Sequence, residues 1–495
     1  MIPDFYVLVF LFCHFSKVAN LIIKFAVIKN YLYNAFYQVL ILIVPLVTTP
    51  YLARVLGPKG VGINSYTNSI IQYFILFGSL GVNLYGNRQI AFVRNDRQRL
   101  TATFYEIFLM RLITVVVASL VFGVFFGLVS NYRIYYLAQA ISLVAVIFDI
   151  SWFFMGIENF AVTVLRNFVI KILTLISIFT LVKSKADLTV YILILSLSLL
   201  IGNLTLFPSL HKYIGRPRFH DLQIAKHFKP ALILFIPQIA TQIYVVLNKT
   251  MLGSMVSVQA SGYFDQSDKI IKMVLAVVTA TGTVMLPHVA NAFANGHLDK
   301  SKEYLYTSFS FITMSSIPMM LGLMAITAKF VPLFFTYRFH GVIPIMLIEA
   351  LIIILVAWSN AIGMQYLLPT NQTKAYTMSV ILGAAVNLIA NIPLIFFWGT
   401  VGAALSTVLS ELSVTLYQLV SIRRQVSYRK LFDDTYKYLL SGLIMFWIVF
   451  SLDRILPNGW FSIIFEVSIG FLTYLTLMML FKVKMLTQAK RFLKK

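Results

Sequence analysis

Cysteine is almost absent from this chain, and charge is scarce for its length. The 495 residues include a single cysteine, Cys13, which excludes an intramolecular disulfide and a cysteine-rich metal site. The seven histidines are scattered without the paired spacing of a zinc site, so neither a metal nor another cofactor is expected. Charged residues make up 12% of the chain, against about a quarter in a typical soluble protein.

Acidic residues are the rarer charge, with 17 Asp and Glu against 40 Lys and Arg, and the net charge is +23. In a soluble protein such a balance would suggest nucleic acid as a partner. Here 59% of the residues are hydrophobic and the mean hydropathy is +0.85, more apolar surface than a soluble core can bury. We therefore predict an integral membrane protein with membrane lipids and not nucleic acid around it.

Long apolar runs recur along the chain with short connections between them. A helix needs about 20 apolar residues to cross the hydrocarbon. The sequence predicts an all-α polytopic membrane protein with about fourteen transmembrane helices and no sizeable extramembrane domain. The predicted spans are 35–54, 62–84, 104–127, 134–156, 161–182, 188–210, 230–250, 266–288, 306–328, 342–365, 376–398, 401–422, 437–456 and 460–481.

The distribution of Lys and Arg predicts the orientation of these helices, because basic residues accumulate on the cytoplasmic side. With the start of the first helix inside, the inner side collects 26 Lys and Arg and the outer side nine. Both termini should then be cytoplasmic. Residues 1–27 do not fit the plan, since the run from Ile2 to Phe12 is too short to span. They read as an interfacial extension or as a mis-called translation start.

Two pairs of segments indicate an internal repeat with an offset close to 200 residues. LILIVPLVTT at 40–49 resembles LILFIPQIAT at 232–241, and GVGINSYTNSII at 60–71 resembles ASGYFDQSDKII at 260–271, with Gly62 matched to Gly262. Six helices per unit is an even number, so both units insert in the same direction, related by an axis along the membrane normal. We predict a first six-helix unit at 28–212, a second at 213–428, and two further helices with a basic tail at 429–495.

Polar residues occupy equivalent helix positions in the two predicted units and form a stripe in each. In the second unit four charged residues share one helix face, and the same offsets in the first unit are polar. The residues are Asp265, Asp268, Lys269 and Lys272 in the second unit and Ser65, Asn68, Ser69 and Gln72 in the first. Lipid cannot solvate such stripes, so they predict an aqueous cavity between the units. The alternative is that the charged set forms solvated i,i+4 pairs.

Several other ionisable residues lie inside predicted spans. Lys171 falls near the bilayer midplane, Arg111 lies about two turns into its helix, and Lys249 lies at the end of another. A charge at the centre of a span costs on the order of 3 kcal/mol, so these cations predict an anionic ligand, with snorkelling to the interface as the alternative. Asp149 and Glu411 are candidates for coupling Na⁺ or H⁺, or for pairing with a neighbouring helix.

Signals of catalysis are weak. Gly57-Pro58-Lys59-Gly60 lacks the Lys-Ser/Thr ending of a phosphate-binding loop and reads as a turn. The outer loops carry no paired carboxylates, and we expect a protein that is not an enzyme.

Six short segments together resemble one known family, the Wzx-type polysaccharide flippases, which belong to the superfamily of MATE exporters and the lipid II flippase MurJ. The segments are PYLARVLGPKGVG at 50–62, YGNRQIA at 85–91, SWFFMGIENF at 151–160, LNKTMLG at 247–253, SGYFDQSDKI at 261–270 and QYLLPTNQTKAY at 365–376. The position of Asn248 is often acidic in that family, which puts a carboxylate-coupled role there in doubt.

The resemblance implies two six-helix lobes around a cavity. It also implies that the protein moves undecaprenyl-pyrophosphate-linked oligosaccharide from the inner to the outer leaflet for capsule, exopolysaccharide or O-antigen assembly, next to a polymerase and chain-length machinery. Lipid II flipping, drug or ion antiport, and a membrane polymerase or glycosyltransferase remain as alternatives.

Overall fold

The computed structural model describes residues 43–485, except for the side chains of 236–238, 240, 241, 243–245 and 281–285. The predictions for residues 1–27, and the beginning of the first predicted span, lie outside the described residues. Within that range the chain is helical, and ten helical stretches are long and apolar enough to cross a membrane. Two of the ten contain a sharp break, so the number of crossings exceeds the number of stretches.

The helices follow the predicted order. After a helical segment at residues 43–79, they are α2 (Val82–Val93), α3 (Arg97–Leu128), α4 (Arg133–Ile147), α5 (Ser151–Gly156), α6 (Phe160–Leu181), α7 (Leu188–Leu204), α8 (Phe207–Leu210), α9 (Phe228–Met255), α10 (Val258–Thr279), α11 (Thr281–Ala294), α12 (Leu298–Phe334), α13 (Val342–Glu349), α14 (Ile352–Ser359), α15 (Thr373–Ile422), α16 (Tyr428–Leu431), α17 (Thr435–Ile455) and α18 (Trp460–Leu480). Each of the fourteen predicted spans falls on this helical chain, as far as the structure describes it.

Glycine accounts for the two breaks inside apparently continuous helices. Gly57 has a φ of 67° and Gly399 a φ of 54°, in the region where a side chain would be strained. At the second break, a Cβ on Gly402 would lie 1.9 Å from the carbonyl oxygen of Leu394, so only glycine allows the two halves of α15 to approach so closely. The Gly57-Pro58 turn predicted from the sequence is therefore present.

Helix ends differ from the predicted spans where polar residues continue a helix beyond the bilayer. α3 begins at Arg97, seven residues before the predicted span, because the carboxylate of Asp96 accepts hydrogen bonds from the backbone N–H groups of Gln98 and Arg99. The second span ends at residue 79, where Leu80 and Gly81 adopt positive φ and bend the chain into α2.

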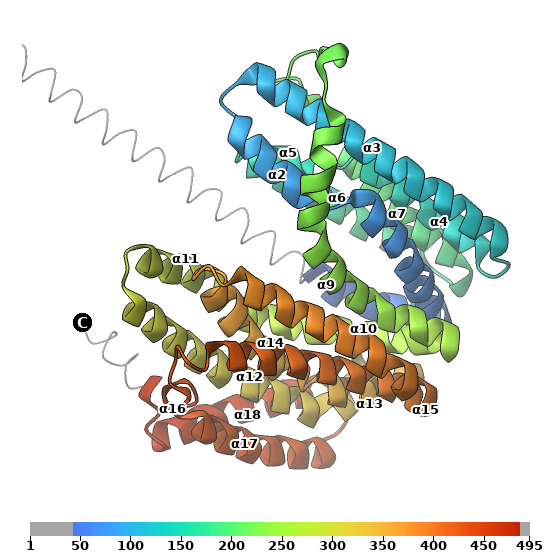
Figure 1. Ribbon diagram of the computed structural model, residues 1–495. Helices are drawn as coiled ribbons and strands as arrows, with labels where there is room; N and C mark the ends of the chain where they lie inside the picture. Colours follow the sequence, from blue (N-terminus) through green and yellow to red (C-terminus); the bar gives the residue numbers. More distant parts are fainter. Residues whose placement is uncertain (1–42, 486–495) are drawn as a thin grey trace, which may run out of the picture.

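The helices form two groups, which Figure 1 shows diverging from a common contact. The N-lobe comprises the described helices from residue 43 to α8, and the C-lobe comprises α9 to α15, with α17 packed on α12 and α18 on α17. α9 crosses between them: its first turns contact α2, and its remainder packs on α10 and α15.

Besides the contact that the start of α9 makes with the N-lobe, the lobes meet at one end, here called the closed end. Gly62 and Gly262 meet there, and a Cβ on Gly262 would lie 2.8 Å from the Cα of Gly62. The Arg54 guanidinium also donates a 3.0 Å hydrogen bond to the carbonyl of Leu333. At the opposite, open end, the described loops 94–96, 157–159 and 211–222 make no hydrogen bond or ion pair to the described loops 295–297, 368–372 and 423–434.

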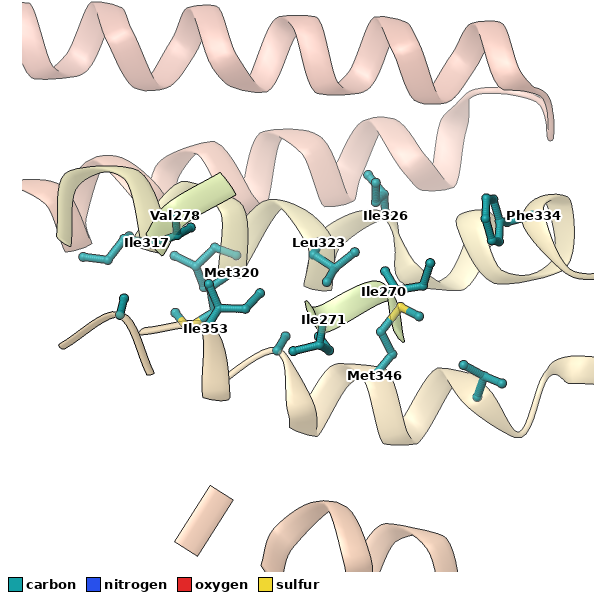
Figure 2. Close-up of a cluster of buried hydrophobic side chains, with 14 of the residues drawn as sticks. Ile270, Ile271, Val278, Ile317, Met320, Leu323, Ile326, Phe334, Met346 and Ile353 are labelled. Atoms are coloured by element: carbon teal, nitrogen blue, oxygen red, sulfur yellow. The ribbon is translucent and has the colours of Figure 1, made fainter. Parts of the chain in front are cut away.

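Apolar side chains fill the interior of each lobe, and one buried cluster includes residues of both, Leu56 and Val61 of the N-lobe and Val258 of the C-lobe among them. In the C-lobe, Figure 2 shows Ile270 and Ile271 of α10 facing Met320 and Leu323 of α12 and Met346 of α13. All five are at least nine-tenths buried. Such close packing makes each lobe a rigid unit, so relative movement is concentrated where the lobes meet.

We predict that Gly62→Ala lowers the thermal midpoint of the purified protein. A Cβ at this position would lie 2.1 Å from the carbonyl oxygen of Val258, so the backbone must shift, and overpacking of this kind costs about 1–3 kcal/mol. Gly123→Ala is the matched control, because no atom lies within 4 Å of a Cβ there. Equal midpoints for the two variants would contradict a tight glycine contact between the lobes.

Candidate functional site

A lysine from α9 joins the charged stripe of α10 and pairs with both of its aspartates. The ammonium of Lys249 lies 2.5 Å from Oδ1 of Asp265 and 3.5 Å from Oδ2 of Asp268. Lys269 and Lys272 complete i,i+4 pairs with the same carboxylates, at 2.6 and 2.7 Å. The i,i+4 pairs considered from the sequence are therefore present. Asp265, however, is only 7% exposed, so the network is partly buried and has one lysine more than it has aspartates.

The polar stripe of the first repeat lies against the second. Ser65 hydrogen-bonds to Ser261 across the lobes, with 3.1 Å between the two hydroxyl oxygens, and Ser69 lies 2.8 Å from the Thr250 hydroxyl. Asn68 is exposed and accepts a long hydrogen bond from Gln72. One side of the predicted stripe thus forms lobe-to-lobe contacts, and the other faces away from them.

A pocket of about 180 Å³ lies between the lobes next to this contact. Its polar lining includes Asn64 and Lys171 of the N-lobe and Gln266 and Lys269 of the C-lobe. Lys171 lies in the middle of α6, about 15 Å from either helix end, which places it near the bilayer midplane. Its ammonium makes no ion pair or hydrogen bond with any described residue. The structure thus brings together, from opposite lobes, two of the lysines singled out in the sequence.

A second cavity of about 380 Å³ lies within the C-lobe and has the opposite character. Asp268, Glu349 and Glu411 contribute carboxylates to it, and Lys272 contributes the one basic side chain of its lining. Glu349 is 1% exposed, and its Oε2 has no hydrogen-bond partner in the described part of the chain. In the sequence Glu349 is one of several carboxylates inside predicted spans. Its burial beside α10, which only the structure shows, distinguishes it from the others.

Arg111 and Asp149 are paired with each other inside the N-lobe. The Arg111 side chain is fully buried, donates to Asn83 at 2.5 Å and to the Asp149 carbonyl, and lies 3.7 Å from an Asp149 carboxylate oxygen. Ser151 donates to the same carboxylate through its backbone and its hydroxyl. Two roles were predicted for Asp149, ion coupling or pairing with a neighbouring helix, and the structure shows the pairing. Arg111 lines neither of the two cavities described above.

A buried network missed by the sequence reasoning anchors the start of α9 to the N-lobe. Glu106 of α3 accepts hydrogen bonds from the Gln223 backbone and from Lys226, and lies 2.8 Å from Nε2 of His227. Nδ1 of His227 lies 2.6 Å from the Tyr85 hydroxyl. Burial lowers the pKa of His227, and the neutral ring can donate from Nε2 to Glu106 and accept from Tyr85. No spacing along the sequence links these three segments.

A second missed network joins α9 to both halves of α15. Asn391 donates to Asn248 at 2.6 Å and to Asn387 at 2.9 Å, and Asn248 donates to the Thr407 hydroxyl at 2.7 Å. The i,i+4 spacing of Asn387 and Asn391 in an apolar run was the signal available in the sequence. At the position of Asn248 the chain therefore carries a neutral, hydrogen-bonded amide.

Comparison with known proteins identifies the family. A family model described as polysaccharide biosynthesis protein matches residues 27–293, which is more than half of the chain. The chain belongs to the polysaccharide biosynthesis protein family. This match confirms the resemblance to Wzx-type flippases that the six sequence segments indicated.

Two curated relatives agree with the family. The "Putative O-antigen transporter" of Escherichia coli (strain K12) is 22% identical over 407 residues, covering 81% of this chain and 97% of that protein. The lipid II flippase MurJ of Bacillus subtilis (strain 168) is also 22% identical, over 186 residues that cover 36% of this chain and 32% of MurJ.

Solved structures share the fold. The lipid II flippase MurJ in an inward closed conformation matches with a TM-score of 0.72 at 18% identity, covering 93% of this chain and all of that one. A MATE family multidrug transporter in an inward-facing conformation matches with a TM-score of 0.61 at 12% identity, covering 78% of this chain and 95% of that one. The predicted fold class, an all-α multi-pass membrane protein like MATE and MurJ, is confirmed.

We predict that Lys249→Ala destabilises the protein far more than Lys272→Ala. Lys249 is the partly buried partner shared by both aspartates, and without it each carboxylate keeps only a more exposed lysine; losing a buried partner costs up to about 3–5 kcal/mol. The Lys272 side chain is 48% exposed and belongs to a single pair, for which about 0–1 kcal/mol is usual. Unfolding by denaturing detergent measures both, and similar losses would contradict a central role for Lys249.

Proposed function

We propose that this chain is a flippase for lipid-linked oligosaccharide units, specifically undecaprenyl-pyrophosphate-linked repeat units. It carries them from the inner to the outer leaflet of a bacterial inner membrane for O-antigen, capsule or exopolysaccharide assembly. The observation that carries the proposal is the interlobe pocket near mid-membrane, where Lys171, which pairs with none of the described residues, lies across from Lys269 of the other lobe. The family match and the transporter relatives support this function over that of an enzyme.

The physical problem is a diphosphate in a bilayer. The idealised cost of moving one ion into hydrocarbon is of order 20 kcal/mol. A pocket with a free lysine supplies a counter-charge, while Asn64 and Gln266 offer hydrogen bonds to phosphate or sugar oxygens. The polyprenyl tail stays in lipid. In this account Lys249, Asp265, Asp268 and Lys272 position α10 and Lys269, and Arg111 holds the N-lobe together.

The open end faces the cytoplasm in this proposal, and both termini lie on that side. The loops at the open end carry most of the basic residues outside the spans, which supports this orientation. The substrate would enter between the lobes from the open end, and the contact of Gly62 with Gly262 would break to release it on the other side. A polymerase and chain-length machinery would receive the unit there.

The driving force need not come from an ion. Moving an anion outward across an inside-negative membrane is favourable by about 2.3 kcal/mol per charge per 100 mV. Asp149 is engaged with Arg111, which leaves Glu411 in the C-lobe cavity as the ion-coupling candidate from the sequence. We propose a coupling role for Glu411 only as an adjunct to the membrane potential.

Lipid II is the second candidate substrate, because the chain shares its fold with MurJ. Complementation of a strain that lacks its own lipid II flippase separates the two. Growth of that strain on this chain would favour lipid II, and restoration of surface polysaccharide in a strain lacking its oligosaccharide flippase would favour the function proposed here.

We predict that Lys171→Ala and Lys171→Glu abolish surface polysaccharide at unchanged protein level, because the pocket loses its unpaired cation. Lys185→Ala is the matched control, since Lys185 is exposed in the loop before α7 and lines neither cavity. Immunoblotting of cell-surface polysaccharide measures the effect. Normal polymer in the Lys171 variants would refute this site.

A further inference from the structure

A third cavity, of about 650 Å³, lies at the closed end and shares no lining residue with the two cavities described above. Both lobes line it. The N-lobe contributes Lys59, Tyr66, the loop 128–132 and Tyr136, and the C-lobe contributes residues 253, 254 and 257–259. It lies at the opposite end of the molecule from the open-end loops. We call it the tyrosine pocket.

Three aromatic rings form one wall of the tyrosine pocket. Tyr66 and Tyr132 pack edge to face with ring centroids 6.3 Å apart, and Tyr136 is buried beside them. The Tyr66 ring lies directly on the backbone of α9, because a Cβ on Gly253 would be 2.0 Å from its Cδ2 atom. Tyrosines that anchor a protein at the membrane interface face lipid, whereas these line a pocket between two lobes.

Polar groups without partners complete the lining. The amides of Asn131 and Gln259 and the ammonium of Lys59 make no hydrogen bond or ion pair with any described residue. Asn131 comes from the N-lobe and Gln259 from the C-lobe, so the two amides approach the pocket from opposite sides. The pocket therefore combines aromatic faces with donors and acceptors that are available to a ligand.

This combination fits a saccharide. A sugar ring has apolar C–H faces that suit aromatic surfaces, and a rim of hydroxyls that need both donors and acceptors, which amides supply. An acyl chain would leave the amides unpaired. Lys59 adds a counter-charge suited to an acidic sugar or to a phosphate substituent.

We propose that the tyrosine pocket binds the saccharide portion of the exported unit at the closed end, separately from the lysine pocket that faces the diphosphate. The proposal rests on the proposed function for the identity of the saccharide. Because both lobes line the pocket, a bound saccharide bridges them there and stabilises their contact.

The test measures saccharide binding to the purified full-length protein. The probe is the soluble repeat unit released by mild acid from the host strain's surface polysaccharide, and isothermal titration gives the Kd. The Asn131→Ala/Gln259→Ala double variant should weaken binding about tenfold, the scale expected for two lost hydrogen bonds, and Tyr66→Leu should weaken it at least as much. Asn458→Ala is the matched control, an exposed amide in another closed-end loop, and should bind as the wild type does.

Two results would overturn the inference. One is the absence of saccharide binding by the wild type, or an unchanged Kd in the double variant. The other is displacement of the repeat unit by glycerophosphate at equal concentration, which would show a lipid headgroup site. Lys171→Ala separates this inference from the proposed function: retained saccharide binding with lost export supports both. Retained export of a wild type that binds no saccharide refutes the tyrosine pocket alone.

Discussion

The close approach of Gly62 to Gly262 is the constraint on which the arrangement of the lobes depends. The sequence predicts these two residues as equivalents in an internal repeat, and their backbones meet where no side chain fits. The Ser65–Ser261 and Ser69–Thr250 hydrogen bonds lie along the same seam. Glycine and short hydroxyl side chains make the close contacts of this seam, beside buried apolar residues of both lobes such as Leu56, Val61 and Val258. Separating the lobes there exposes part of this shared cluster, which adds to the free-energy cost of opening.

The distribution of charge follows from this seam. Immediately beside it, Lys249 crosses from α9 to both aspartates of α10, which fixes the helix that carries Lys269. On the opposite lobe Lys171 has no partner among the described residues, and both lysines line the pocket between the lobes. The carboxylates of Glu349 and Glu411 line a different cavity on the far side of α10. One helix thus separates a site suited to an anion from a site suited to a cation, and movement of α10 would affect both.

Much of the fold could be predicted from the sequence, because hydrocarbon allows few structures. The apolar runs gave the helices, and the Gly62/Gly262 match identified the two residues that meet between the lobes. Helix ends were less accurate, since Asp96 caps α3 well outside the apolar run. The site was harder to predict because it depends on partners distant in sequence. Arg111 looked like Lys171 in the sequence, yet Asn83 and Asp149 surround one and no described group pairs with the other. The Glu106–His227 anchor and the unpartnered Glu349 likewise become visible only when the helices are packed.

The central claim is that transport requires the lobes to separate at the Gly62–Gly262 seam. A disulfide across the seam tests it directly, in a background where Cys13 is replaced by serine. The hydroxyl oxygens of Ser65 and Ser261 are 3.1 Å apart, so the Ser65→Cys/Ser261→Cys pair is placed for a disulfide after a small adjustment. The account predicts that the oxidised double variant exports no polysaccharide, that a reductant restores export, and that each single variant exports in both conditions. Undiminished export by the fully cross-linked protein would contradict it.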